Sequence, residues 1–239
     1  MLRNLDLAKI LFLDIETVPE EENYEALSAT RKSLWEQKSA YQRKEEQTPE
    51  DFYARAGIWA EFGKIVCISV GFFDTSTSDR SFRIKSFSGE ETNLLTQFKQ
   101  LCDEHFYLKT HLLCAHNGKE FDFPYLARRM VIHGIELPQV LNLFGKKPWE
   151  VPHLDTLQLW KFGDYKHYTS LALLTEILGI PSPKDDIDGS DVARVYYEEK
   201  NLPRIVRYCE KDVLSLAQVI LRFIRKPLLK EDQIVWLSE

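Results

Sequence analysis

Two carboxylates stand one residue apart near the start of the chain. Asp14 and Glu16 follow residues 9–13, a short apolar run that is typical of a strand buried on both faces of a sheet. Because side chains alternate along a strand, the two carboxylates are expected on the same side, at the exposed end of the strand. They repel each other unless a cation lies between them, and such oxygen ligands suit Mg²⁺ or Mn²⁺. The alternative is a solvated strand end that leads into a turn.

A second polar group follows residues 112–115, an apolar run that predicts another buried strand. Asn117 then lies at the same edge of the sheet as Asp14, where open α/β sheets place their ligand sites. Asp122 falls near the start of a helix predicted over residues 121–133. The alternative is structural, since Asn-Gly favours a turn and an Asp at a helix start binds free backbone amides.

The third group lies on the longest helical pattern, which Pro203 opens and which continues to Phe223. Tyr208 and Asp212 are four residues apart, so they share one face of this helix, one turn from each other. A carboxylate there can bind a metal ion while the phenol holds a water beside it. The alternative is a partly exposed stripe in which Asp212 is solvated and Tyr208 packs sideways.

The elements that would position these residues alternate between strands and helices. Further strands are predicted over residues 64–73, 83–87 and 153–155, and further helices around residues 94–102 and 170–178. This order predicts an α/β fold in which helices pack on a mixed sheet. Residues 20–62, rich in Glu, Lys, Gln and Ala, interrupt it as a helical insertion.

The composition limits the kind of protein. The 239 residues carry 31 Lys and Arg against 37 Asp and Glu, a formal charge of −6, which excludes a generally basic nucleic-acid coat. With 44% hydrophobic residues a packed core is expected, in one domain over residues 1–239. The longest apolar stretch, residues 65–73, is too short to span a bilayer, and no signal-peptide core precedes Asp14, so a soluble, cytoplasmic protein is expected. The four cysteines are expected to be buried free thiols.

Together, the three groups resemble the exonuclease motifs of the DEDD superfamily. Asp-Ile-Glu-Thr at residues 14–17, Asn-x-x-x-Phe-Asp at 117–122 and Tyr-x-x-x-Asp at 208–212 are similar in order and context to those of the proofreading 3′→5′ exonuclease domain of family B DNA polymerases. Arg207 stands where the histidine branch of the superfamily carries His, so the chain resembles the tyrosine branch. The likeness covers roughly residues 9–225. It implies a stand-alone exonuclease with a ribonuclease H-like mixed sheet and helices packed on both faces.

The resemblance implies hydrolysis of phosphodiester bonds with two divalent cations, Mg²⁺ or Mn²⁺. Asp14, Glu16 and Asp212 would be direct metal ligands, Asp122 would act through metal-bound waters, and Tyr208 would orient the attacking water. The implied substrate is the 3′ end of single-stranded DNA, and the products are nucleoside 5′-monophosphates. The alternatives are an RNA-trimming exonuclease and a non-catalytic nucleic-acid-binding module on the same fold.

The same comparison places four further residues near the nucleic acid. Thr17 and Asn117 offer polar groups to a sugar or phosphate, and Phe121 offers a ring on which a base can stack, with core packing as its alternative. Lys184 can meet the scissile phosphate, with an ordinary surface lysine as its alternative. His153 and Asp155 are expected to be structural, because the pair lacks the other ligands of a histidine metal site.

Basic residues elsewhere could follow the nucleic-acid backbone. Clusters stand at residues 128–129, 146–147 and 222–226, although each is also typical of a solvated face. The insertion is expected to dock through an apolar face made of Leu34, Trp35, Tyr41, Phe52, Tyr53 and Trp59. It would then either cover one side of the sheet or form a wall of the single-strand channel. The cations of such a wall would be Arg31, Lys32, Lys38, Arg43 and Lys44.

Overall fold

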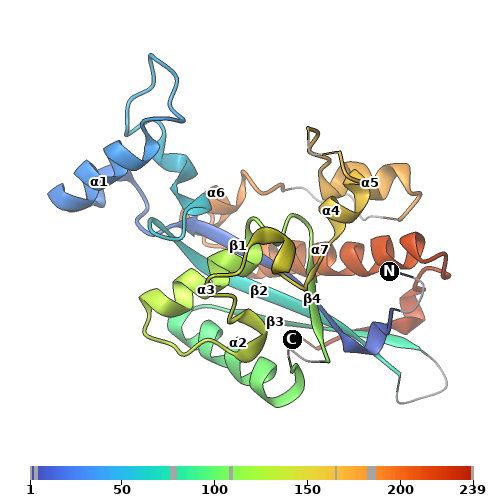
Figure 1. Ribbon diagram of the computed structural model, residues 1–239. Coiled ribbons are helices and arrows are strands. Elements are labelled where there is room, and N and C mark those ends of the chain that lie inside the picture. The colour runs from blue at the N-terminus through green and yellow to red at the C-terminus, as the bar shows by residue number, and fades with distance from the viewer. Residues whose placement is uncertain are drawn as a thin grey trace.

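Six strands form a mixed sheet at the centre of the protein (Figure 1): β1 (Ile10–Pro19), β2 (Gly63–Asp74), β3 (Ser81–Ser88), β4 (Leu112–Ala115), β5 (Leu154–Asp155) and β6 (Ile234–Trp236). The computed structural model describes residues 2, 5–75, 80–107, 110–164, 166–181 and 187–237. The strand order is β5-β4-β1-β2-β3-β6. The β1–β2 and β2–β3 pairs are antiparallel, whereas β1–β4, β4–β5 and β3–β6 are parallel.

Helices cover both faces of this sheet, because the side chains of β1 alternate between two apolar clusters. Leu11, Leu13 and Ile15 pack with α2 (Glu91–His105) and α3 (Asp122–Ile132) on one face. Ile10 and Phe12 pack with α7 (Leu202–Phe223) on the other face. The mixed sheet with helices on both faces that the sequence predicted is thus confirmed.

Three short helices contact α7. They are α4 (Thr156–Lys161), α5 (Leu171–Ile177) and α6 (Val192–Tyr197). All four cysteines are buried and free, as the sequence predicted. Among the described residues, no helix combines the length and the apolar character that crossing a membrane requires.

β1 is longer than the apolar run that predicted it. It continues past Leu13 to Pro19 and pairs with β2, so that Asp14 lies opposite Ser69 and Glu16 opposite Cys67. The prediction that the two carboxylates leave the sheet at the end of the strand was therefore wrong. β6 was not predicted, because a strand of three residues is too short for its periodicity to be recognised.

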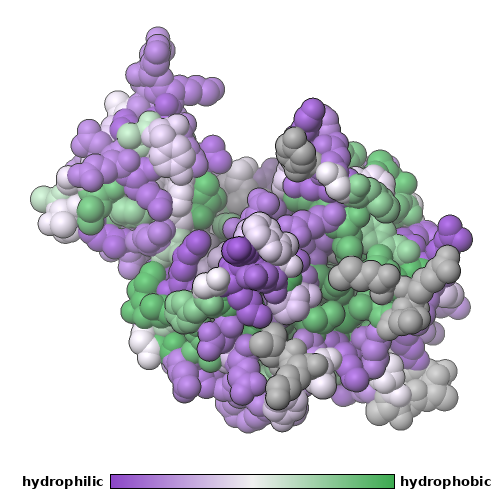
Figure 2. Space-filling view, viewed as in Figure 1, coloured by the Kyte–Doolittle hydropathy of each residue, from purple (hydrophilic) through white to green (hydrophobic). Residues whose placement is uncertain are grey.

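The insertion between β1 and β2 has an apolar core of its own. Trp35, on α1 (Ala29–Ser39), is fully buried against the rings of Phe52, Tyr53 and Phe62. The predicted apolar face was wrong in two positions, because Leu34 is 51% and Tyr41 73% exposed. The insertion projects from the sheet, and Figure 2 shows the surface hollowed between it and the projection formed by α4 and α5.

The cations of the insertion contact groups of the insertion itself or next to it. Arg31 pairs with Glu20, Lys32 with Glu25 and Lys38 with Glu61, while Arg43 donates to the carbonyls of Gln47 and Glu36. Cations that already face carboxylates or carbonyls are less available to phosphates. The apolar core and these pairs weigh against the channel wall, but the insertion projects from the sheet and does not cover one side of it as the alternative expected.

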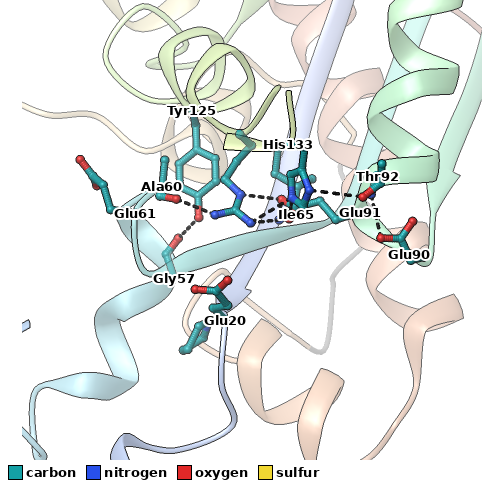
Figure 3. A network of polar contacts seen from close by, with 12 residues as sticks. Glu20, Gly57, Ala60, Glu61, Ile65, Glu90, Glu91, Thr92, Tyr125 and His133 are labelled. Carbon is teal, nitrogen blue, oxygen red and sulfur yellow. Dashed lines mark hydrogen bonds and ion pairs between the residues drawn. The ribbon is translucent and has the colours of Figure 1, made fainter. Parts of the chain in front are cut away.

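A buried polar network ties the insertion to α2 and α3 (Figure 3). Arg129 donates from Nε and Nη2 to the carboxylate of Glu91, at 2.9 and 2.5 Å, and from Nη1 to the carbonyl of Ala60, at 2.8 Å. Glu91 also accepts from the backbone amide of Ile65 at 2.7 Å. Arg129 is 2% exposed, so its predicted place in a basic surface cluster with Arg128 was wrong.

Candidate active site

The face of the sheet that carries α7 also carries the first two carboxylates. Asp14 and Glu16 have the same parity along β1 as Ile10 and Phe12, which pack against α7. Asp14 is half-buried and Glu16 is 7% exposed. The two carboxylates therefore lie between the sheet and a helix, where solvent screens their charges poorly.

The third predicted motif comes to this place on α7. The thiol of Cys209 donates to Oδ2 of Asp14 at 3.3 Å and approaches the backbone carbonyl of Asp14 at 3.4 Å. Ligand atoms of Asp14, Glu16 and Cys209 all lie within 4.8 Å of one another. Asp212, one turn beyond Tyr208 and half-buried like it, is close enough for its charge to act on both Asp14 and Glu16.

The carboxylates act on one another electrostatically. Burial, then the charges of Glu16, Asp212 and Asp122, raise the pKa of Asp14 well above its usual range. Burial, with the charges of Asp212, Cys67 and Asp122, does the same to the pKa of Glu16. The groups that act on these two carboxyls are thus carboxylates and thiols.

Asp122 joins the cluster from the N-terminus of α3. Burial, with the charges of Asp155 and Asp212, raises its pKa to about 7. Burial and the charge of Asp212 also raise the pKa of Tyr208, so its phenol stays protonated at neutral pH. The four carboxylates predicted from three separate motifs therefore meet in one site, together with the predicted tyrosine.

The turn between β4 and α3 is held by Asp155. This carboxylate, 2% exposed, accepts hydrogen bonds from the backbone amides of Asn117 at 3.0 Å and Lys119 at 3.2 Å, and from those of Leu157 and Gln158 at the start of α4. Asn117 itself has a φ of 61°, which suits an asparagine at a tight turn. Asp155 thus positions the turn that leads to Asp122.

His153 and Asp155 are structural, as predicted. The Nδ1 atom of His153 accepts from the backbone amide of Leu113 at 3.2 Å, and Nε2 donates to the carbonyl of Val140 at 2.8 Å. Both ring nitrogens are therefore used within the fold, and burial lowers the pKa of His153 to about 4.

Of the residues predicted to touch the nucleic acid, three make contacts within the fold and one falls outside the described residues. The side chain of Thr17 is hydrogen-bonded to Tyr125, whose hydroxyl donates to the carbonyl of Gly57 at 2.8 Å. Phe121 is half-buried, with its ring centroid 5.3 Å from that of Tyr125. Asn117 lies in the turn before α3, and Lys184 falls outside the described residues. Their contacts with a substrate stay predictions.

Sequence reasoning missed three residues at the site. Cys209 stands between Tyr208 and Asp212, and its position inside the third motif was the one available signal. His116 directly precedes Asn117, and it lies with its ring centroid 6.3 Å from that of Tyr168. Nothing in the sequence around Tyr168 connects it to the carboxylates, because the contact joins distant parts of the chain.

The donor set fits hard divalent cations. Asp14, Glu16, Asp122 and Asp212 supply oxygen ligands, which Mg²⁺ and Mn²⁺ prefer over nitrogen and sulfur. Their mutual repulsion and burial are relieved when positive charge lies among them. The thiol of Cys209 lies beside the oxygen ligands of Asp14 and Glu16.

Two comparisons with known proteins bear on this site. A family model described as a predicted 3′-5′ exonuclease related to the exonuclease domain of PolB matches residues 58–232, which include Asp122, Tyr208 and Asp212. The family B DNA polymerase from the hyperthermophilic archaeon Pyrobaculum calidifontis has a similar structure, with a TM-score of 0.54 and 16% sequence identity. The match covers 89% of this chain and 24% of the polymerase, so the chain spans about a quarter of that protein. At this identity the likeness concerns the fold, which is ribonuclease H-like as predicted.

Proposed function

The chain belongs to the family of predicted 3′-5′ exonucleases related to the exonuclease domain of PolB, and from this premise we propose that it hydrolyses the 3′ end of single-stranded DNA in a metal-dependent reaction. The observation that carries the proposal is the meeting of Asp14, Glu16, Asp122 and Asp212 in one partly buried site. A fold keeps such mutual repulsion only at a cost in stability, which a bound cation offsets.

In this proposal the carboxylates hold two divalent cations, Mg²⁺ or Mn²⁺. Asp14, Glu16 and Asp212 are the direct ligands, and Asp122 contacts the cations through water. When bound, the cations supply positive charge to the attacking water and to the leaving 3′-oxygen. Tyr208 marks the tyrosine branch of the DEDD superfamily. Its protonated phenol can donate to one oxygen and accept from another, which orients the attacking water.

The reaction forms one bond and breaks one. The oxygen of water attacks the phosphorus in line with the bond to the 3′-oxygen, and that bond breaks. The water gives up its proton, the 3′-oxygen gains one, and the terminal nucleotide leaves as a nucleoside 5′-monophosphate. The chain that remains is one nucleotide shorter and ends in a 3′-hydroxyl, ready for another cycle.

DNA is preferred over RNA in this proposal because residues 117–125 resemble the second motif of the polymerase domain. An RNA-trimming exonuclease shares the chemistry and remains the second candidate. A non-catalytic module is disfavoured, because nucleic-acid binding alone does not require four repelling carboxylates. The single domain over residues 1–239 and a cytoplasmic location stay predictions.

The test uses matched 5′-labelled single strands of DNA and RNA, each with Mg²⁺, Mn²⁺ or EDTA. We expect stepwise shortening of the DNA from its 3′ end, release of 5′-mononucleotides, and no reaction in EDTA. Asp212→Asn serves as the control for a contaminating nuclease. Internal cuts by the purified protein, or full activity in EDTA, contradict the proposal, and faster loss of RNA favours the second candidate.

A further inference from the structure

The segment between α4 and α5 exposes two aromatic rings on the surface. Phe162 is 88% and Tyr168 66% exposed, and exposed Lys166 stands near them in sequence. This segment lies on the projection that faces the insertion across the hollow seen in Figure 2. Exposed rings interleaved with cations are the pattern by which proteins hold single-stranded nucleic acid without regard to sequence.

Phe162 occupies a backbone conformation that phenylalanine rarely adopts. It has a φ of 46° at the C-terminal end of α4, a position that favours glycine or asparagine. Its ring gains little from the fold in return, since it meets Trp160 edge-on at 6.4 Å and otherwise faces solvent. Residues held in such conformations cluster at ligand-binding sites.

Tyr168 is tied to the carboxylate site through His116. Nε2 of His116 donates to the carbonyl of Thr169 at 2.8 Å, and Nδ1 accepts from the hydroxyl of Thr156 at 2.8 Å. The ring of His116 also meets that of Tyr168 in a T-shaped contact. Because His116 directly precedes Asn117 at the end of β4, it holds Tyr168 close to the turn that carries Asp122.

The charges around Tyr168 agree with this placement. After burial, the charges of Asp122 and Asp155 are the causes that raise the pKa of the Tyr168 phenol. The phenol therefore lies within reach of the field of the carboxylate site, while most of the ring remains open to solvent. An exposed ring beside a hydrolytic site is placed to meet the substrate.

We propose that Tyr168 and Phe162 form a stacking platform for the bases of the single strand that enters the carboxylate site, with Lys166 beside its phosphates. The inference rests on the proposed function, because it takes the strand to end at the four carboxylates. It replaces the channel wall that the sequence suggested for the insertion, whose cations are mostly engaged with their own neighbours. The platform reads no base identity, since every base has a face that can stack.

The test combines a substitution in the protein with a change in the substrate and asks whether their effects on affinity are additive. Affinity for a 5′-fluorescent single strand of twelve thymidylates is measured by anisotropy in Ca²⁺, which binds oxygen ligands but tolerates looser geometry than Mg²⁺. Tyr168→Ala is expected to weaken binding by roughly 5- to 100-fold, the loss typical of one stacked base. Trp149→Ala is the matched control, because Trp149 is also an exposed ring, at 77% against 66% for Tyr168, and lies beside Lys147.

Abasic residues are then placed singly at the last three positions of the strand. At one of these positions, Tyr168→Ala is expected to cause no further loss, because the base that it stacks on is already absent, and Tyr168→Trp is expected to retain affinity. In turnover, Tyr168→Ala should raise KM more than it lowers kcat.

The proposed platform is contradicted if Tyr168→Ala and the abasic residue cause additive losses of affinity at all three positions. It is also contradicted if Trp149→Ala weakens binding as much as Tyr168→Ala. Since binding is measured without turnover, a wild-type protein that binds the strand but fails to hydrolyse it contradicts the proposed function alone.

Discussion

The thiol of Cys209 donates a hydrogen bond to Oδ2 of Asp14, across 195 residues of sequence. This contact joins one turn of α7 to the middle of β1, and it lowers the pKa of Asp14 against the effects of burial and repulsion. A hydrogen bond to the charged form of a carboxylate also fixes its orientation, which is the role of groups that surround metal ligands.

Removing this donor is expected to weaken metal binding. Cys209→Ala should raise the Mg²⁺ concentration that gives half-maximal activity by about 10-fold, the lower end of the range for groups that orient metal ligands. Cys209→Ser keeps a donor and should recover most of the loss. A metal titration of both variants checks this, and an unchanged requirement in Cys209→Ala would show that the thiol only fills space.

The carboxylates and the phenol should differ in the size of their effect on turnover. Asp14→Asn and Asp212→Asn remove proposed metal ligands, so we expect kcat to fall by several orders of magnitude. Tyr208→Phe removes only the hydroxyl that orients water, and a loss of roughly 10- to 1000-fold is expected. Single-turnover rates on a labelled strand measure both. Wild-type rates in folded Asp212→Asn would refute the assignment of the third motif.

The metal-free protein should lose stability as the pH rises. The folded pKa of Asp122 is about 7, above the value of about 3.9 expected in the unfolded chain, so the folded state holds its proton more tightly. This contribution to stability is fully present below about pH 4 and is lost as the pH rises through about 7. Asp14 and Glu16 shift in the same direction.

Thermal unfolding in EDTA between about pH 5 and pH 8 measures this effect. We expect a fall on the order of a few kcal/mol, a flatter profile for Asp122→Asn, and recovery of the wild-type protein with Mg²⁺. Burial lowers the pKa values of His116 and His153, so these residues reduce the stability of the folded protein as the pH falls below about 6.5. Both proteins contain them, so they do not affect the comparison. Equal profiles for wild type and Asp122→Asn would contradict the prediction.

The buried ion pair of Arg129 and Glu91 should contribute far more to the stability of the fold than exposed Arg128 does. Arg129→Met leaves the carboxylate of Glu91 buried without its main partner, which is expected to cost about 3–5 kcal/mol in the free energy of unfolding. Arg128→Met, on an exposed side chain of the same helix, should change it by less than about 0.5 kcal/mol. Urea unfolding compares the two, and adding Glu91→Gln should recover part of the loss.

Cations of the proposed platform and of the insertion should respond differently to salt. Lys166→Ala is expected to lower the slope of log affinity against log salt by about 0.7, for the one phosphate that the protein no longer neutralises. Arg43→Ala with Lys44→Ala should leave the slope unchanged, because Arg43 donates to carbonyls of the insertion. The reverse result would restore the insertion as the wall of the channel.

The sequence predicted best what depends on local pattern. The helix over residues 202–223 and the buried strands follow from the spacing of apolar residues. The meeting of the four carboxylates could be predicted through the motif resemblance, because Asp14 and Glu16 lie within β1 and not at the strand end that the pattern indicated. The motif resemblance supplied the order of these residues along the chain.

What the sequence could not predict depends on distant partners. Arg129 stands beside Arg128 in sequence, yet only Arg129 meets a buried carboxylate on another helix. Leu34 and Tyr41 have the same apolar character as Trp35, but of these three only Trp35 is buried in the core of the insertion. The extension of β1 beyond Leu13 required the pairing partner on β2, which no pattern within residues 14–19 reveals.

The closed ends of the insertion also affect how the chain folds. The amide of Glu20 donates to the carbonyl of Phe62 at 2.8 Å, next to the last β1–β2 pair, Pro19 and Gly63. The two central strands, β1 and β2, form a hairpin. Closing its loop over residues 20–62 costs roughly 3 kcal/mol more free energy, through lost chain entropy, than closing a two-residue turn. If the insertion assembles around Trp35 first, that loop is effectively shortened before the strands meet. Refolding should therefore slow markedly when this local nucleus is weakened, for example by Trp35→Ala.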